Sequence, residues 1–386
     1  MELMELVLAE LRSREAYKCE IYAPYYVCSF LVHAFNLVNT RKGIYWEGKQ
    51  IPNMRLHVLF VAPSGYMKTY YINQMGGGNF GIFRNAGIHV GFEQNMTEAG
   101  FIGTIQNVNG VGIPTEGAAL TYRDGMLLID EFSAITSAMK VQYNTQLDSQ
   151  LLSALDHGKV FKRLGGGKIE YTTNLSLWAG VQPARYDLSS GLGRRMCFLV
   201  FLPTKYDNES LLIAMHKARN RKPDLAGMNT LWAKVNALIK DMDNIEAVTF
   251  DDSVLKKYQE LKLFSYEGNY FDRLLIGWHL ATYGPEKHIH LSCTGKEINE
   301  LIMREKTWRD DIAKGIDYIQ MVKIIRACGV EIDNGKEGIR YEIPKSILVD
   351  EAIMVGWNAQ QVHAMITEMM KFGMVGMKSG RVVLEG

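Results

Sequence analysis

Apolar residues along the chain follow two different periods. Residues 1 to about 40 have helical spacing, for example at Val27, Phe30, Leu31 and Ala34. Five short runs follow that are apolar without alternation: 56–62, 88–92, 126–129, 175–181 and 197–202. Such runs are typical of strands covered on both faces, as in a parallel sheet wound with helices. This pattern predicts an α/β fold with a parallel sheet.

Helical periods return from about residue 208 and continue to about 312. Beyond them, the sequence predicts helices around 316–328 and 346–355, and a third that Asn358 caps at its N-terminus. Two apolar arms flank Lys378-Ser379-Gly380 and predict a closing hairpin, because glycine supplies the positive φ of a tight turn. Three helices and a hairpin are typical of a winged helix.

Four parts are therefore expected. They are a helical lead-in (1–50), an α/β core (51–207), a helical subdomain (208–312) and a winged-helix domain (313–386).

Composition places the chain among globular proteins. Of 386 residues, 47% are apolar, which is typical of a globular protein. The net charge is only +1, so any contact with nucleic acid must be made by a local group of basic residues. The five cysteines form no C-x-x-C pair, which disfavours a structural zinc site and a disulfide framework. No run reaches the ~20 apolar residues of a membrane span, and the charged N-terminus does not resemble an export signal. These features predict a cytoplasmic protein that does not contact a membrane.

The first apolar run leads directly into Ala62-Pro63-Ser64-Gly65-Tyr66-Met67-Lys68-Thr69. The Lys-Thr pair and the strand-loop-helix setting match the phosphate-binding pattern G-x-x-x-x-G-K-[ST], while Ala62 and Met67 replace both glycines. In that pattern, Lys68 reaches the β- and γ-phosphates and the Thr69 hydroxyl binds Mg²⁺. Met67 puts a side chain where the backbone usually approaches phosphate closely. The alternative is an ordinary strand-to-helix turn.

Two later runs end in residues that phosphate hydrolysis requires. One ends in Asp130 and Glu131, which are suited to completing the Mg²⁺ shell and to polarising the attacking water. The alternative is a strand that ends in a solvated acidic turn. Another run ends in Gln182, whose amide can bond both the γ-phosphate and the water. The predicted ATP site comprises Pro63, Ser64, Gly65, Tyr66, Met67, Lys68, Thr69 and Asp130, with Thr69 and Asp130 on the metal.

Arg194 and Arg195 precede the fifth run, where a guanidinium at a subunit edge can reach a neighbour's γ-phosphate. The alternative is a solvated basic turn. Taken in order, APSGYMKT, LLIDEF, WAGVQP and GLGRRM resemble the AAA+ superfamily of P-loop ATPases. The approach EGAALTYRDG to LLIDEF, and the helix QLLSALD before GKVFKR, are similar to the minichromosome maintenance branch and related helicases of viruses and mobile elements. The resemblance covers roughly residues 55–205.

The resemblance implies a helical lid after the ATPase core and assigns further roles. By position, Glu131 matches the catalytic carboxylate, and Gln182 matches the first sensor, which is usually asparagine in this family. Arg195, in preference to Arg194, matches the arginine finger. Arg273, at the start of a predicted helix, is similar to the second sensor in the lid. The stretch 162–168 falls at the hairpin that points into a hexamer's central channel.

The composition of that hairpin agrees with a role on DNA. Lys162, Arg163 and Lys168, with three glycines between them, form a cationic tip suited to gripping phosphates without reading sequence. The alternative is a flexible solvated hairpin. A second loop, 106–112, falls where the branch has its helix-2 insert and carries no basic residue. The branch's N-terminal DNA-binding module is not found before residue 50, so we expect loading to differ or to depend on a loader or primase.

Three functions remain open at this point. The first is a hexameric ATP-driven helicase or translocase on single- or double-stranded DNA, acting in replication of a virus or mobile element, in the nucleoid or the infected host cytoplasm. The second is a DNA-binding or scaffolding module with a weak ATP site. The third is a regulatory AAA+ ATPase stimulated by a protein partner. The helix 358–372 has one lysine and several methionines, which suits protein contact better than base reading.

Overall fold

The centre of the protein is a five-stranded parallel sheet in the order β11-β3-β10-β7-β4. The computed structural model describes residues 2–46, 49–50, 54–93, 96–108, 111–132, 145–164, 167–182, 195–219, 224–333 and 339–385. The strands are β3 (His57–Val61), β4 (Val90–Glu93), β7 (Met126–Ile129), β10 (Ser176–Val181) and β11 (Met196–Val200). They coincide with the five apolar runs, so the predicted α/β fold with a parallel sheet is confirmed.

The order of the strands makes β3 and β10 a topological switch point. After β3, the next strand of this sheet is β4 at one edge, whereas after β10 it is β11 at the other edge. The connections that leave these two neighbouring strands run in opposite directions. In open α/β sheets, ligands bind outside the carboxyl ends of such a pair of strands. The residues that follow β3 and β10 are therefore placed where such ligands bind.

The amino-terminal helices α1 (Leu3–Ser13) and α2 (Cys19–Lys42) belong to the core rather than preceding it. The Trp178 indole of β10 donates to the Ser29 hydroxyl of α2 at 2.8 Å. Among the described helices, α2 alone is long and apolar enough to cross a membrane, contrary to the estimate from the sequence. However, 89% of its most apolar stretch is buried in the protein, as in the core helix of a soluble protein.

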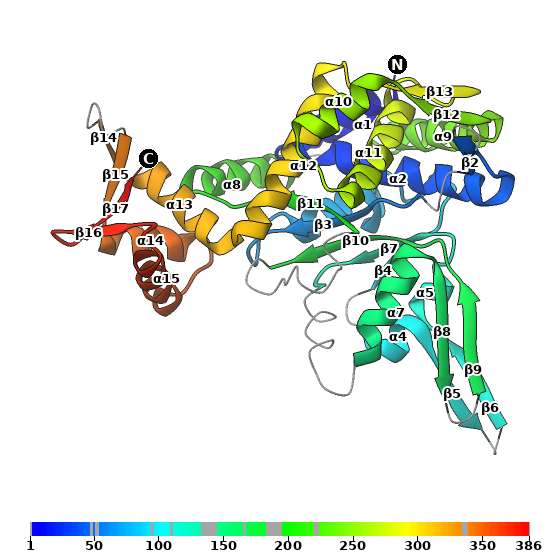
Figure 1. The fold of residues 1–386 in the computed structure, drawn as a ribbon, viewed down its shortest axis with the longest axis horizontal. Coiled ribbons are helices and arrows are strands. Elements are labelled where there is room, and N and C mark those ends of the chain that lie inside the picture. The colour runs from blue at the N-terminus through cyan, green and yellow to red at the C-terminus, as the bar shows by residue number, and fades with distance from the viewer. Residues whose placement is uncertain are drawn as a thin grey trace.

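Helices between residues 205 and 314 cover the amino-terminal helices and one edge of the sheet. They are α8 (Lys205–Arg219), α9 (Leu225–Asp241), α10 (Asp252–Glu260), α11 (Ser265–Thr282) and α12 (Lys296–Lys314). Helix α11 lies along α2 (Figure 1) and approaches it closely at Gly277, where an added Cβ would be 2.6 Å from the Cys28 carbonyl oxygen. One buried cluster extends from Leu3 to Ile312.

A second, small sheet was not predicted. It has the order β13-β12-β1-β2 and consists of β1 (Tyr45–Trp46), β2 (Lys49–Gln50), β12 (Ala247–Phe250) and β13 (His288–Leu291). It joins the start of the chain to the helices after residue 225.

The carboxyl-terminal domain has its own buried cluster, from Met321 to Leu384. Its elements are α13 (Ile316–Cys328), β14 (Val330–Asp333), β15 (Ile339–Pro344), α14 (Lys345–Met354), α15 (Ala359–Lys371), β16 (Gly376–Lys378) and β17 (Arg381–Glu385). The three predicted helices and the hairpin are present. Asn358 caps α15 as expected, and Ser379 and Gly380 take positive φ of 48° and 76° in the turn. The pair β14–β15 was not predicted.

Two hairpins project from the body beside each other (Figure 1). They are β5 (Gly103–Val108) with β6 (Val111–Glu116), and β8 (Lys159–Leu164) with β9 (Gly167–Thr172). The short helices α4 (Glu98–Ile102) and α5 (Ala118–Thr121) flank the first, and α7 (Thr145–Asp156) precedes the second. The Tyr171 hydroxyl of β9 donates to the Ile102 carbonyl at 2.8 Å, which ties the two hairpins together.

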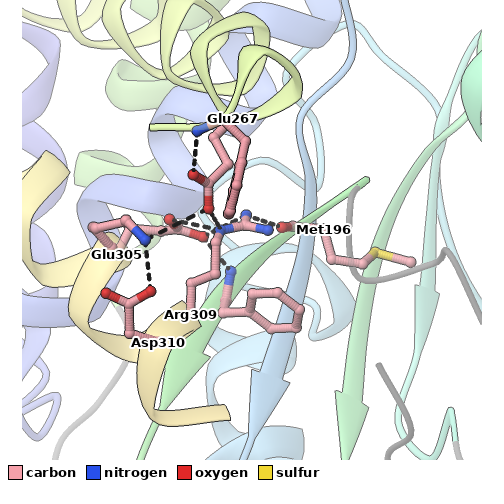
Figure 2. A network of polar contacts seen from close by, with 8 residues as sticks. Met196, Glu267, Glu305, Arg309 and Asp310 are labelled. Atoms are coloured by element: carbon pink, nitrogen blue, oxygen red, sulfur yellow. Dashed lines mark hydrogen bonds and ion pairs between the residues drawn. The ribbon is translucent and has the colours of Figure 1, made fainter. Parts of the chain in front are cut away.

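The outer edge of β11 is closed by a buried ion pair from α12 (Figure 2). The Arg309 guanidinium donates to Glu305 and to the Met196 carbonyl, both at 2.8 Å. Glu305 in turn accepts the Phe198 N–H at 3.2 Å. Unpaired backbone groups at a sheet edge invite pairing with another chain, and this network uses two of them.

We predict that Arg309→Leu lowers the free energy of unfolding by about 3–5 kcal/mol, because it leaves the fully buried Glu305 carboxylate without its cation. Urea unfolding measures the change. Lys296→Ala, which breaks the exposed Lys296–Glu300 pair of the same helix, is the control and should cost less than about 1 kcal/mol. An equally small loss for Arg309→Leu would show that the network does not stabilise the edge.

Candidate active site

The loop after β3 makes two sharp turns before α3 (Lys68–Ile72) begins. Gly65 has φ +80° with no atom within 4 Å of an added Cβ, so backbone conformation alone favours glycine there. Met67 has φ +43° and is the central residue of a three-residue turn. The turn is closed by the Lys68 N–H, which donates to the Tyr66 carbonyl at 2.5 Å. A three-residue turn with positive φ is strained for a residue other than glycine.

The Met67 side chain does not enter the loop. It is 3% exposed and belongs to the hydrophobic core. The side chain is therefore packed inside the protein at the position where the phosphate-binding pattern has glycine. Among the residues that the structure describes, the N–H groups of Ser64, Gly65 and Met67 have no hydrogen-bond partner, which leaves donors of the kind that phosphate needs.

Lys68 folds back over its own loop. Its Nζ donates to the Ala62 carbonyl at 2.9 Å and to the Pro63 carbonyl at 2.8 Å, and the side chain is 5% exposed. Charges interact strongly in a buried setting of low dielectric, so an anion that enters the loop would be attracted to this ammonium. An incoming phosphate would compete with these carbonyls for Nζ.

The ends of β3, β7 and β10 bring together the other predicted residues. The Thr69 hydroxyl donates to the Asp130 carboxylate. The Gln182 amide donates to the Glu131 carboxylate at 3.1 Å. No three His, Cys, Asp or Glu side chains cluster within the described ranges, so a Mg²⁺ ion on Thr69 and Asp130 would take its remaining ligands from phosphate oxygens and water.

Gly180 makes this convergence possible and was missed in the sequence. A Cβ on Gly180 would lie 2.5 Å from the Asp130 carbonyl oxygen and 3.0 Å from the Lys68 Cβ. The Gly180 carbonyl also accepts the Phe132 N–H at 2.7 Å. A glycine inside an otherwise apolar strand marks close approach of backbone, and this signal was available in WAGVQP.

Arg195 and Arg273 lie at the other end of the sheet. Arg195 comes just before β11, whose Met196 pairs in register with His57 at the start of β3. Its guanidinium donates to Asp156 at 2.6 Å. The five residues of β3 span about 16 Å at ~3.3 Å each, so Arg195 cannot reach the Lys68 loop of its own chain. Arg194 lies outside the described residues.

Arg273, which is similar to the second sensor, belongs to α11. Its Nη1 donates to the carbonyl of Arg55, immediately before β3, at 2.8 Å. Burial lowers the pKa of Arg273, and it lowers the pKa of the neighbouring Arg55 to about 9. The amino ends of the strands thus hold a group of closely spaced cations with Asp156 as a counter-ion.

The basic residues of the second hairpin lie on a projecting element (Figure 1). The stretch β8–β9 forms the predicted hairpin, and its tip residues Gly165 and Gly166 lie outside the described residues. Lys168 pairs with Glu170 at 2.8 Å, and Arg163 lies 5.9 Å from the centre of the Phe161 ring. Lys162 is half-buried, whereas Arg163 and Lys168 are exposed.

Comparisons with known proteins add no relative. No model of a known protein family matches the sequence, and no curated protein is similar to it.

We predict that Gly180→Ala weakens binding of Mg·ATP at least tenfold, about 1.4 kcal/mol, because the new methyl group pushes Lys68 away from Asp130. Titration calorimetry measures the affinity. Gly376→Ala adds a methyl group where no atom lies within 4 Å and serves as the control. Unchanged affinity in Gly180→Ala would mean that the close packing of these strand ends does not matter for the ligand.

Proposed function

We propose that the chain is an ATP hydrolase of the AAA+ superfamily, of the minichromosome maintenance type, that moves along DNA. The observation that carries the proposal is the meeting of Lys68, Thr69, Asp130, Glu131 and Gln182 at the ends of three strands. These residue types in one crevice meet the needs of phosphoryl transfer to water: a cation on the phosphates, oxygen ligands for Mg²⁺, a carboxylate and an amide.

The chemistry assigns one role to each side chain. Lys68 exchanges its two carbonyl partners for the β- and γ-phosphates. Thr69 and Asp130 supply oxygen ligands for a Mg²⁺ ion, which neutralises charge on the phosphates. Glu131 accepts the proton of the water that attacks the γ-phosphorus, and ADP leaves in line with it. Gln182 donates to Glu131 and would orient the γ-phosphate and the water.

The remote arginines support assembly of several copies. Arg195 lies about 16 Å or more from its own phosphate loop, so a role on the γ-phosphate requires the site of a neighbouring subunit. Arg273 and Arg55 share that end of the sheet, where the Arg55 side chain is buried inside the protein. A ring in which each subunit completes the next one's site, such as the hexamer of the family, accounts for arginines at the amino ends of the strands.

DNA contact is assigned to the paired hairpins. The β8–β9 hairpin projects with Arg163 and Lys168 exposed, next to the β5–β6 hairpin (Figure 1). Cationic groups on a projecting element grip phosphates without reading bases. The carboxyl-terminal domain, proposed to be a winged helix, exposes Met370 and Phe372 at the end of α15 and suits contact with a protein such as a loader or primase. A cytoplasmic location is part of this proposal.

One observation favours the alternative of a scaffolding module with a weak ATP site. Met67 holds a positive φ that costs about 1–3 kcal/mol and that glycine would relieve. The two functions differ in whether hydrolysis depends on Lys68 and Glu131.

We predict that Lys68→Ala abolishes DNA-stimulated ATP hydrolysis because the phosphates lose their cation. Glu131→Gln should lower the rate constant by about 10²–10⁴-fold with binding of ATP retained, because it removes the general base alone. Phosphate release measures the rates, and Lys296→Ala on α12 is a charge-matched control expected to behave as the wild type. Near-zero rates in the wild type as well as in the variants would support the scaffold instead.

We predict that Arg163→Ala together with Lys162→Ala weakens DNA binding and lowers the slope of log affinity against log salt by about 1.4 for a single strand, since two phosphate contacts are lost. Fluorescence anisotropy with a labelled oligonucleotide at several salt concentrations measures both quantities. The basal ATPase rate should not change. A slope equal to that of the wild type would remove the hairpin from the DNA path.

A further inference from the structure

A cavity of about 280 Å³ separates the phosphate loop from the carboxyl-terminal domain. Pro63 and Ser64 of the loop and Gln182 at the end of β10 form one wall. The other wall comes from α13, from the turn before α15 and from α15 itself, and includes Gln320 and Trp357. Its volume is near the lower end of the ~300–1,000 Å³ that ligand pockets have. The cavity is therefore continuous with the proposed phosphate site but lies mainly on another domain.

The lining has the chemistry of a nucleobase pocket. Trp357 and Met365 supply a half-buried aromatic and thioether surface for a flat ring. Asp317 and Glu368 add carboxylates, which repel phosphate but accept hydrogen bonds from an amino group. Burial raises the pKa of Asp317.

Gln320 is an amide without a partner at this wall. The side chain is 1% exposed, and within the described part of the chain its Nε2 makes no hydrogen bond. A buried donor left unpaired costs about 1–3 kcal/mol, so such groups usually serve a ligand or a bound water. A ring nitrogen of a base is an acceptor of the required kind.

The carboxyl-terminal domain is built so that a ligand can govern its position. Its buried cluster is separate from that of the main body, and Gly315, with φ +100°, joins α12 to α13. Across the gap, the Tyr66 hydroxyl donates to the Met354 carbonyl at 3.1 Å, and Lys205 pairs with Glu351 at 3.5 Å. Ile319 of α13 also packs against the buried cluster of the main body. A ligand that touches both walls would strengthen the docking of the domain.

We propose that the carboxyl-terminal domain of the same chain binds the base of the nucleotide in this cavity and selects bases with an exocyclic amino group, such as adenine. The inference rests on the proposed function, because Lys68 and Thr69 hold the phosphates. The base packs on Trp357, a ring nitrogen accepts from Gln320, and the amino group donates to Asp317 or Glu368. Nucleotide binding then fixes the domain against the loop through Pro63 and Gly356, whose added Cβ would lie 3.6 Å from the Pro63 Cβ.

Calorimetric titrations with three probes in the presence of Mg²⁺ separate the base from the phosphates. The probes are ATP, ITP, which lacks the amino group, and inorganic tripolyphosphate, which lacks the nucleoside. ATP is expected to bind the full-length chain at least tenfold more tightly than ITP. Trp357→Ala should weaken ATP at least tenfold and change the affinity for tripolyphosphate less than twofold. Trp357→Phe, which keeps an aromatic face, should recover most of the loss.

Two controls guard against a folding defect. Met370→Ala, on the exposed side of α15, should leave all three affinities unchanged. Gln320→Leu removes the unpaired donor. It should weaken binding of ATP and of ITP and leave binding of tripolyphosphate unchanged.

The outcomes distinguish this inference from the proposed function. Equal affinities for ATP and ITP, with no effect of Trp357→Ala and with tripolyphosphate bound normally, would overturn the base site and leave the phosphate site standing. No binding of any probe would overturn both. Loss of tripolyphosphate binding in Trp357→Ala would also count against the inference, because it would mean that the carboxyl-terminal domain binds the phosphates rather than the base.

Discussion

Three strand ends can meet around one small volume because position 180 has no side chain. The Gly180 Cα lies between the backbone of Asp130 and the side chain of Lys68, with distances of 2.5 and 3.0 Å to an added Cβ. This close approach brings the Lys-Thr pair after β3 near the two carboxylates after β7 and the amide after β10. Around this point Lys68 bonds to its own loop, Thr69 to Asp130 and Gln182 to Glu131.

The loop before Lys68 balances strain against burial. Holding Met67 at φ +43° costs about 1–3 kcal/mol, whereas burying its side chain contributes about 1.5–3 kcal/mol. The two effects are of similar size, so a side chain is tolerated at a position where the phosphate-binding pattern has glycine.

The central sheet could be predicted from the sequence because its strands are buried on both faces and are therefore apolar throughout. The site residues could be predicted because they directly follow those strands. The strands β12, β13 and β14 were missed because they are short and carry polar residues. The position of Arg273 and the Arg195–Asp156 pair could not be foreseen, since they follow from how α11 and α7 pack against the sheet. The contact of the carboxyl-terminal domain with Pro63 is likewise a tertiary feature that no local pattern records.

The central claim is that the turn ending at Lys68 and Thr69 binds a triphosphate together with Mg²⁺. Equilibrium binding of ATP to the purified protein, with Mg²⁺ present and after its chelation, tests the claim most directly. The account predicts saturable binding of one nucleotide per chain that weakens at least tenfold when Mg²⁺ is removed. Absence of saturable binding under both conditions would contradict it.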